Sequence, residues 1–259
     1  DDEIAELYLE EAEIKQDVSM AAIRRATIKL LVTPVLCGAA YKNKGIQLLL
    51  DAVVDYLPSP MDLGAVIAQD PDDEERTIQR NPSSNEPFAA LAFKLINDPY
   101  VGQQTFIRIF SGKLTSGMSF YNTNKMKYER AGRIFRIKAK EREEISEAGA
   151  GEIVALVGMK YTKTGDTLCD ENQPVLLESI QIPPAVIEMK VNIEDKKNRN
   201  KLGEVLAKLC NEDPSFQSHY DEETEETIIA GMGELHLEIM VDRISNEFKV
   251  PITVGEPSV

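Results

Sequence analysis

The apolar residues in the last third of the chain change their spacing in an order that few folds share. The predicted elements are a strand over Ile187–Ile193, a helix over Leu202–Cys210, two strands over Phe216–Tyr220 and Thr227–Ala230, a helix over Leu237–Phe248 and a strand over Val250–Val254. Strand residues alternate in hydropathy, whereas helix residues recur every three or four positions. The order β-α-β-β-α-β predicts a ferredoxin-like domain over residues 184–259.

The middle of the chain, residues 87–183, is rich in expected strands. It contains β-branched or aromatic runs that are separated by Gly, Asp and Ser turn residues. These runs are Phe88–Ile96, Thr105–Phe110, Met118–Asn122, Gly132–Ala139 and Ile153–Gly158. Short strands at this spacing predict an antiparallel β-barrel, since closure removes exposed strand edges.

The first 68 residues combine helices with one strand-like run. Val18–Leu30 and Ile46–Leu57 have helical spacing, and a Pro-Ser-Pro sequence ends the second of these segments. Leu31–Cys37, between them, is short, apolar and β-branched, which predicts a buried strand. This order is typical of the C-terminal piece of an α/β domain. Residues 69–86 are polar and acidic without a period, so we expect a linker or loop there. The expected fold class is multidomain α+β.

The charge of the chain limits its partners. The 259 residues carry a net charge of −15, which argues against a general nucleic-acid binder. Residues 124–142 differ, with eight basic against two acidic residues and a local charge of +6. Within this stretch we select Arg130, Arg133, Arg136 and Lys138 as candidates that face RNA, because basic and apolar residues alternate there. A solvated surface is the alternative.

Cysteine and histidine are scarce. Cys37, Cys169 and Cys210 are far apart and form no CxxC pair, which predicts a reducing cytoplasm rather than a disulfide framework. Two histidines are too few for a histidine-rich metal site. No apolar run approaches the ~20 residues that span a bilayer, so we expect no membrane segment.

Motifs for nucleotide hydrolysis are absent from this sequence. It contains no GxxxxGK[ST] phosphate loop, and Asn43-Lys44-Gly45-Ile46 lacks the Asp of the guanine-reading NKxD motif. No Ser or Cys lies in a nucleophile-elbow pattern. We therefore predict no catalytic residue and no metal ligand in this chain.

Two glycine-containing loops are candidates for close approach to a ligand, with an ordinary tight turn as the alternative for each. Gly38-Ala39-Ala40 follows the expected strand, at the end where α/β sheets bind ligands. Gly231-Met232-Gly233 joins a strand to a helix. We expect these glycines to set the angle between the two elements, with a side chain disfavoured where φ is positive.

Several long segments of this sequence resemble the elongation factor G family of translational GTPases, in the order that the family has them. The segment Val35–Pro60, which contains Gly38-Ala39-Ala40, resembles the last GTPase motif and the helix that follows it. Segments similar to the family's second domain are Glu86–Lys94, Asp98–Gly102 and Thr164–Asp170, and segments similar to its third are Glu212–Phe216, Asp221–Thr224 and Gly231–Ile239. The resemblance covers nearly the whole chain.

The resemblance implies a factor that uses GTP hydrolysis to drive tRNA and mRNA translocation on the ribosome. The chain then contains the end of the GTPase domain (1–68), barrel domain II (87–183) and ferredoxin-like domain III (184–259), as a middle fragment. GTP and Mg²⁺ would be bound by the full-length parent, with no cofactor held in this chain and no activity expected of it on its own. The implied partners are small-subunit ribosomal RNA and a small-subunit protein, contacted by a cytoplasmic monomer.

The resemblance also implies roles for particular residues. Gly38, Ala39 and Ala40 match the family's guanine loop, in which a backbone N–H at the position of Ala40 contacts the base oxygen. Ala39 replaces the family's serine, so the hydroxyl support of that loop is lost. Two further positions depart from the pattern of domain II, where Gln103 replaces an arginine and Glu152 an aspartate. The first removes one expected RNA contact.

Domain III carries a second set of implied site residues. His236 and Arg243 match positions near which the antibiotic fusidic acid binds in related factors, and Ser215 stands where relatives often have threonine. This domain faces the GTPase domain in the family.

Three alternative functions fit parts of this sequence. One is a paralogous translational GTPase of the ribosomal protection type, and another is a free-standing RNA-binding barrel module. The incomplete α/β unit disfavours the second. An acylphosphatase-like enzyme would need a glycine-rich phosphate loop near Glu194–Lys197, and none is present.

Overall fold

The computed structural model describes residues 1–98, 102–139, 141–178, 180–193 and 198–256. The chain divides into two compact units, Asp1–Gly64 and Ala65–Val259, which are described separately. Of the segments named above, residues 99–101 of Asp98–Gly102 and the whole of 194–197 lie outside the described residues.

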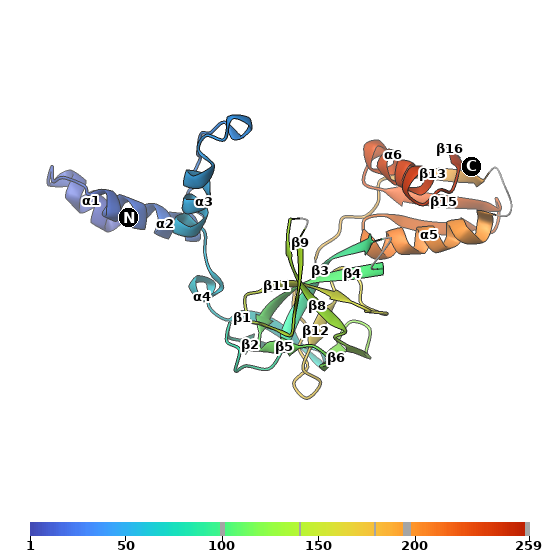
Figure 1. Ribbon diagram of the computed structural model, residues 1–259, viewed down its shortest axis with the longest axis horizontal. Coiled ribbons are helices and arrows are strands. Elements are labelled where there is room, and N and C mark those ends of the chain that lie inside the picture. Colours follow the sequence, from blue (N-terminus) through green and yellow to red (C-terminus); the bar gives the residue numbers. More distant parts are fainter. Residues whose placement is uncertain (99–101, 140, 179, 194–197, 257–259) are drawn as a thin grey trace. The chain divides into compact units, whose positions relative to one another are not determined.

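The N-terminal unit consists of helices (Figure 1). They are α1 (Asp2–Leu9), α2 (Gln16–Ile28), the 3-10 turn η1 (Ala40–Lys42), α3 (Ile46–Tyr56) and α4 (Pro60–Leu63). Arg24 of α2 holds the end of α3, because its Nη1 donates to the carbonyl oxygens of Val54, Asp55 and Leu57 at 2.9–3.2 Å. Its Nη2 lies 2.6 Å from Asp62 of α4. A guanidinium thus satisfies the last carbonyl groups of a helix.

The prediction of a buried strand over Leu31–Cys37 is wrong. No residue of this segment belongs to a named strand, and Leu31 and Val35 are 73% and 87% exposed. A strand needs a neighbour for its backbone groups, and the described residues 1–64 form no named strand. The only strand-like pairing among these described residues is an isolated bridge between Ala39 and Lys44.

The expectation of a linker or loop over residues 69–86 is wrong for 69–80, whereas residues 81–86 belong to no helix or strand. Strands β1 (Val66–Asp70) and β2 (Asp73–Arg80) form an antiparallel hairpin there. Gln69 pairs with Leu176 through backbone hydrogen bonds of 2.8 and 2.9 Å. Ala68 is buried with Cys169, Val175 and Leu177 beneath the hairpin. Charged side chains on the exposed positions concealed the weak apolar alternation of these strands.

An antiparallel β domain follows the hairpin, as the sequence predicted. Its larger sheet has the order β7-β6-β12-β3-β4-β11-β8-β9, and β10 pairs with β5 separately. The strands are β3 (Ala89–Asp98), β4 (Gly102–Ser111), β5 (Lys113–Thr115), β6 (Ser119–Asn122), β7 (Lys127–Arg130), β8 (Arg133–Lys138), β9 (Glu141–Ile145), β10 (Glu147–Gly149), β11 (Ile153–Val157) and β12 (Thr167–Cys169).

This sheet curves around one core. Phe120 of β6 and Ile134 of β8 are distant in the strand order, yet both are fully buried in the same cluster as Phe88 and Leu156. The rings of Phe88 and Phe120 lie 5.9 Å apart. Strands so far apart in a flat sheet could not share a core, so curvature is required.

The C-terminal domain has the predicted β-α-β-β-α-β order. Its elements are β13 (Ile187–Ile193), α5 (Arg199–Glu212), β14 (Gln217–Asp221), β15 (Glu226–Gly231), α6 (Glu234–Asp242), the π turn η3 (Arg243–Glu247) and β16 (Ile252–Gly255). The antiparallel sheet has the order β14-β15-β13-β16. Apolar side chains of both helices share one core with the sheet, including Leu209, Leu237 and Ile229, each fully buried.

Candidate functional site

The Gly38-Ala39-Ala40 loop is closed by the backbone of its own segment. Ala39 and Lys44 exchange N–H···O hydrogen bonds of 3.0 and 3.1 Å. Gly38 passes close to this pair, since a Cβ on it would lie 3.1 Å from the Lys44 carbonyl oxygen. Ala40 is exposed, and within the described chain its N–H has no hydrogen-bond acceptor. That N–H is therefore able to donate to an oxygen atom of a ligand.

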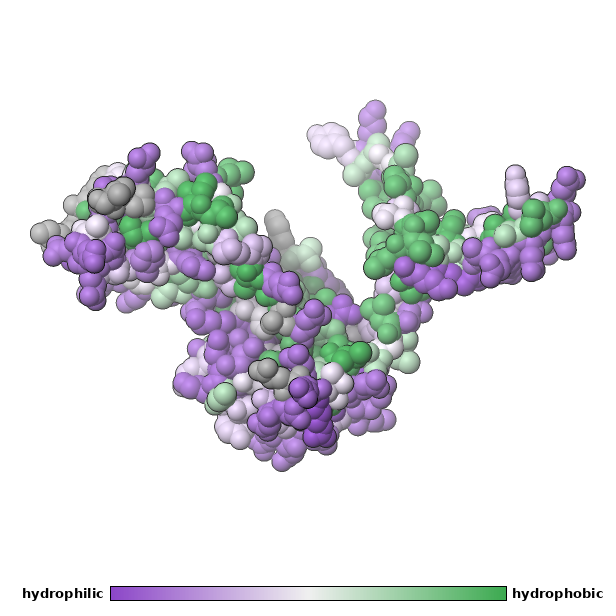
Figure 2. Space-filling view, turned by 180° about the vertical axis from the view of Figure 1, so that it is seen from behind, coloured by the Kyte–Doolittle hydropathy of each residue, from purple (hydrophilic) through white to green (hydrophobic). Residues whose placement is uncertain are grey.

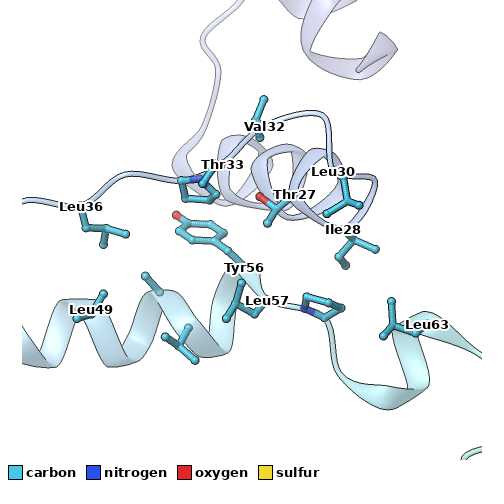
Figure 3. Close-up of a pocket in the computed structure, with 14 residues that line it drawn as sticks. Thr27, Ile28, Leu30, Val32, Thr33, Leu36, Leu49, Tyr56, Leu57 and Leu63 are labelled. Atoms are coloured by element: carbon cyan, nitrogen blue, oxygen red, sulfur yellow. The ribbon is translucent and has the colours of Figure 1, made fainter. Parts of the chain in front are cut away.

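The N-terminal unit also carries a large apolar hollow. A pocket of about 430 Å³ lies between the end of α2, the extended segment 30–36 and α3 (Figure 3). Leu36, Leu49, Val53 and Leu63 line it, and Leu49 and Val53 are about half exposed. Figure 2 shows hydrophobic residues gathered over the helices of this unit. Apolar surface of this extent is typical of protein–protein contacts.

The predicted basic patch is largely neutralised within the sheet. Strand β9 pairs with β8 and places Glu143 opposite Arg136 and Glu141 opposite Lys138. Arg136 contacts Glu143 at 3.6 Å and donates to Glu152 at 2.5 Å. The Lys138 Nζ is also 3.6 Å from Glu143. The local charge of +6 was counted over residues 124–142. Glu143 follows directly after that range, in the strand that pairs with β8.

Strand geometry separates the remaining candidates. Arg133 and Arg136 are three residues apart in a regular strand, so their side chains point to opposite faces. Arg133 lies over the ring of Phe135 at 5.4 Å, and Arg130 donates from Nε to the Gly117 carbonyl at 2.7 Å. The structure therefore does not gather Arg130, Arg133, Arg136 and Lys138 into one patch.

The ion pair of Arg136 and Glu152 shifts both titrations. Hydrogen bonding to Glu152 and the charge of that carboxylate raise the pKa of Arg136. Partial burial of Glu152 opposes its ionisation, but hydrogen bonds from the Gly149 N–H and from Arg136 together lower the pKa of its carboxyl. Glu152, noted above as a departure, holds the turn at Gly149 and one arginine of the basic stretch.

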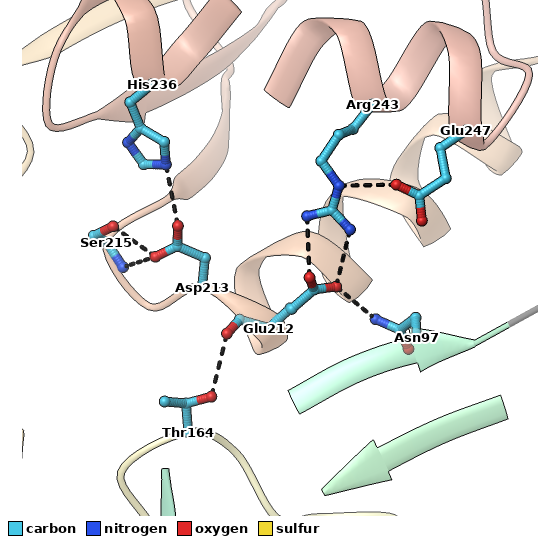
Figure 4. A network of polar contacts seen from close by, with 8 residues as sticks. All are labelled: Asn97, Thr164, Glu212, Asp213, Ser215, His236, Arg243 and Glu247. Carbon is cyan, nitrogen blue, oxygen red and sulfur yellow. Dashed lines mark hydrogen bonds and ion pairs between the residues drawn. The ribbon is translucent and has the colours of Figure 1, made fainter. Parts of the chain in front are cut away.

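Asp213 organises one half of a polar network in the C-terminal domain (Figure 4). Its Oδ2 lies 3.1 Å from His236 Nε2, and its Oδ1 accepts from the N–H and hydroxyl of Ser215 at 2.9 and 2.5 Å. The Met232 N–H donates to His236 Nδ1 at 3.1 Å. Because Nδ1 accepts, the imidazole proton is on Nε2 and is donated to Asp213. Two of the predicted residues, Ser215 and His236, are thus brought together.

Glu212 organises the other half of the network, at the junction between the β domain and the C-terminal domain. Its carboxylate forms a two-pronged ion pair with Arg243 at 3.0 and 3.2 Å and accepts from Asn97 of β3 at 3.1 Å. Its carbonyl oxygen accepts from the Thr164 hydroxyl at 3.2 Å. Figure 4 shows both domains converging on this one residue.

Arg243 is held in its charged form by this network. Burial works against the charge, but hydrogen bonds to Glu247 and Glu212 outweigh it and raise the pKa of the guanidinium. Sequence reasoning selected Arg243 and His236 and missed the acids that hold them, Glu212 and Asp213. Glu212 is the last residue of α5 and Asp213 is its C-cap, directly before Pro214, a position that could have drawn attention to them.

The glycine loop that precedes α6 differs from expectation. Neither Gly231 nor Gly233 has a left-handed φ, and Gly233 is extended at φ 172°. The requirement at Gly231 is space, because a Cβ there would lie 2.8 Å from both His236 Nδ1 and Leu237 Cδ2. A Cβ on Gly233 would meet no atom within 4 Å. Strain from positive φ is therefore not the reason for these glycines.

A buried acidic cluster positions the loop that reaches Glu212. Glu129 accepts from the Lys160 and Tyr161 N–H groups and from the Thr162 hydroxyl. Asp166 accepts from Asn122 at 3.0 Å and from the Lys163 N–H at 2.8 Å. These carboxylates fix both ends of the segment that carries Thr164.

The described part of the chain offers neither a metal cluster nor a membrane-spanning helix. There, no three His, Cys, Asp or Glu side chains come together in a group that could hold a metal ion. None of the helices in it is both long and apolar enough to cross a membrane.

Comparisons with known proteins agree with this architecture. The family model of elongation factor G domain 2 matches residues 87–171, and that of elongation factor G domain III matches residues 182–256. A crystal structure of a protein from Thermus thermophilus is similar over the whole chain, with 25% identity and a TM-score of 0.78. The chain spans 36% of the length of that protein chain.

Two such domains in this order are parts of a translational GTPase. The chain belongs to the elongation factor G family and carries its domains 2 and III. The β domain and the C-terminal domain are called domain 2 and domain III from here on.

Proposed function

We propose that this chain couples the GTPase domain of a translocase to the ribosome during tRNA and mRNA movement. The observation that carries the proposal is the Glu212 junction. One carboxylate and one carbonyl of domain III contact Asn97 and Thr164 of domain 2, and the same carboxylate holds Arg243. A displacement of α5 in domain III would therefore be transmitted to domain 2 through directional, charge-assisted contacts.

The remaining parts of the parent factor are proposed from the family. The phosphates of GTP and the Mg²⁺ ion would bind to parts of the factor outside this chain. The Ala40 N–H of this chain would donate to the guanine oxygen. The apolar hollow beside α3 supports contact of the N-terminal unit with further protein of the GTPase domain. That surface also favours this proposal over a free-standing RNA-binding module.

Ribosome contacts are proposed for both domains. Arg130 and Arg133 have no acidic partner in the described residues, which supports a contact between domain 2 and ribosomal RNA. Ser215, His236 and Arg243 of domain III would face the GTPase domain, a small-subunit protein and, in sensitive factors, fusidic acid. The factor is proposed to act as a cytoplasmic monomer.

A substitution at Glu212 in the full-length factor tests the coupling. Glu212→Gln removes the charge that pairs with Arg243 while preserving the shape of the side chain. We expect ribosome-stimulated GTP hydrolysis to be retained and single-turnover translocation to slow about tenfold, which corresponds to ~1.4 kcal/mol. Glu204→Gln, an exposed position on the same helix, is the control. Equal rates for Glu212→Gln and the control would contradict the proposal.

A further inference from the structure

A groove of about 310 Å³ lies on domain 2, away from the Glu212 junction. Its walls come from the turn between β1 and β2, from the β6–β7 hairpin and from the loop that follows β12. The lining residues used below are Tyr121, Tyr128, Met126, Asp72 and Glu171, and Pro71 and Pro174 complete two of its walls. The volume is at the lower end of the range for ligand pockets, which suits one or two side chains.

One wall of the groove is aromatic. Tyr121 and Tyr128 are directly opposite in the β6–β7 pair, with ring centroids 5.2 Å apart and planes tilted by 54°. Their strand neighbours Phe120 and Glu129 are buried, so alternation places the tyrosines on the opposite face of the strands, where Tyr121 is partly buried against the apolar cluster beneath the β1–β2 hairpin. Tyr128 is 64% exposed, and Met126 between the strands is 80% exposed. Tyr128 and Met126 therefore present an uncovered apolar face beside the partly buried ring of Tyr121.

The charge around that face is negative. Asp72 and Glu171 are exposed, and neither carboxylate has a partner in the described part of the chain. The nearby cations are occupied, since Lys127 Nζ lies 4.2 Å from the centre of the Tyr161 ring and Lys125 Nζ lies 3.6 Å from Asp166. A phosphate group would thus meet repulsion here, whereas a cation would be attracted.

We propose that this groove docks a basic segment of a partner protein. A lysine or arginine side chain would lie against the faces of Tyr121 and Tyr128, with its charge next to Asp72 and Glu171. Cations are attracted to aromatic faces, and arginine and tyrosine are frequent at the centres of protein interfaces. The proposed RNA contacts of domain 2 involve other residues, so this site adds a protein-binding surface to that domain.

The test uses this chain and a fluorescein-labelled twelve-residue peptide that contains four arginines. Binding is followed by fluorescence anisotropy at low salt. Tyr128→Ala, Tyr128→Leu and the double variant Asp72→Asn/Glu171→Gln are each expected to weaken binding about three- to thirtyfold, in line with one exposed to partly desolvated cation–π contact. Tyr128→Leu separates loss of the ring face from loss of apolar area, and thermal melting checks that each variant folds.

Matched controls address the net charge of −15, which attracts any basic peptide. Tyr220→Ala removes an exposed tyrosine of domain III, and Glu204→Gln/Glu222→Gln removes the same charge from that domain. We expect less than a twofold change for both. Equal weakening by these controls would overturn the proposal. So would binding of a single-stranded RNA oligonucleotide that depends on Tyr128 while peptide binding does not.

Discussion

Neighbouring residues at the end of α5 have separate tasks. Asp213 holds the His236 ring and Ser215 within domain III, whereas Glu212 connects Arg243 to domain 2. Removal of the Asp213 carboxylate would therefore affect domain III, whereas removal of the Glu212 carboxylate would affect the contact between domain III and domain 2. Gly231 belongs to the same arrangement, because the space that it leaves is occupied by the His236 ring.

Gly231 should accept no side chain. Gly231→Ala would place a Cβ 2.8 Å from His236 Nδ1 and Leu237 Cδ2, and the ring would have to leave its hydrogen bonds with Met232 and Asp213. We expect a loss of about 1–3 kcal/mol in the free energy of unfolding, as for other overpacked sites. Urea denaturation measures this loss.

Gly233→Ser is the matched control for that measurement. Gly233 is extended, has free space at its Cβ and precedes α6, where serine is a favourable N-cap. We expect unchanged or slightly higher stability. If Gly233→Ser were as destabilising as Gly231→Ala, steric contact at Gly231 would not be the cause.

The Arg136–Glu152 pair predicts a dependence of stability on pH. Because the pKa of Glu152 is lowered in the folded state, its contribution is present above the pKa of the unfolded chain. That contribution is lost as the pH falls through the lower, folded-state pKa. We expect Glu152→Gln to cost about 0.5–1 kcal/mol at pH 7, since solvent screens the pair, and to cost less at pH 3. A difference between variant and parent that is constant with pH would contradict this assignment.

At the scale of elements, the pairing of β8 with β9 decides what the basic stretch can do. Residues that form one cluster along the chain are distributed over two faces, and two of them, Arg136 and Lys138, are paired with Glu143 of the next strand. Arg133 remains on the outer face beside Phe135, whereas Arg136 lies within an ion-pair network. The two arginines are therefore expected to respond differently to substitution.

Charge reversal separates these two roles. Arg133→Glu should weaken pelleting of the chain with small ribosomal subunits by roughly threefold or more at low salt, without a change in melting temperature. Arg136→Glu should lower the melting temperature, because it faces Glu143 and Glu152. Unchanged pelleting for Arg133→Glu would exclude the strand face that carries Arg133 from the proposed RNA contact.

At the scale of the whole molecule, the N-terminal unit contributes an apolar surface and the loop Gly38-Ala39-Ala40, which we propose contacts a guanine base. Within the described residues, the only nucleotide-directed group that we identify is the Ala40 N–H. One hydrogen bond contributes about 1 kcal/mol net, whereas millimolar binding already needs about 4 kcal/mol. We therefore expect the described residues to make too few interactions to retain a nucleotide.

These free energies predict that the chain neither binds nor hydrolyses GTP, whereas the proposed full-length factor would do both. Calorimetric titration with GTP and Mg²⁺, beside the full-length factor, measures the difference. Saturable micromolar binding by the chain would reveal a nucleotide site that its residues do not suggest. A full-length factor without GTP binding would contradict the proposed function itself.

The sequence by itself determined the order of elements in domain III and the strand content of domain 2. Periodicity reports which face of an element is buried, and Leu209, Ile229 and Leu237 are buried as their spacing requires. The family resemblance selected Ser215, His236 and Arg243 as site residues, and that assignment stays a prediction. These properties depend on local spacing or on motif similarity, both of which are readable along the chain.

Only the tertiary structure decided which strands pair and which side chains form hydrogen bonds and ion pairs. Leu31–Cys37 has the composition of a strand but pairs with no neighbouring strand among the described residues. Residues 66–80 pair as a hairpin, and a bridge from Gln69 to Leu176 joins that hairpin to the rest of the unit. Arg136 and Lys138 of the basic stretch pair with Glu143 and Glu152. Glu212 became a junction through its contact with Asn97, 115 residues away in sequence. Hydrogen bonds and ion pairs depend on distance in space, which residue spacing does not report.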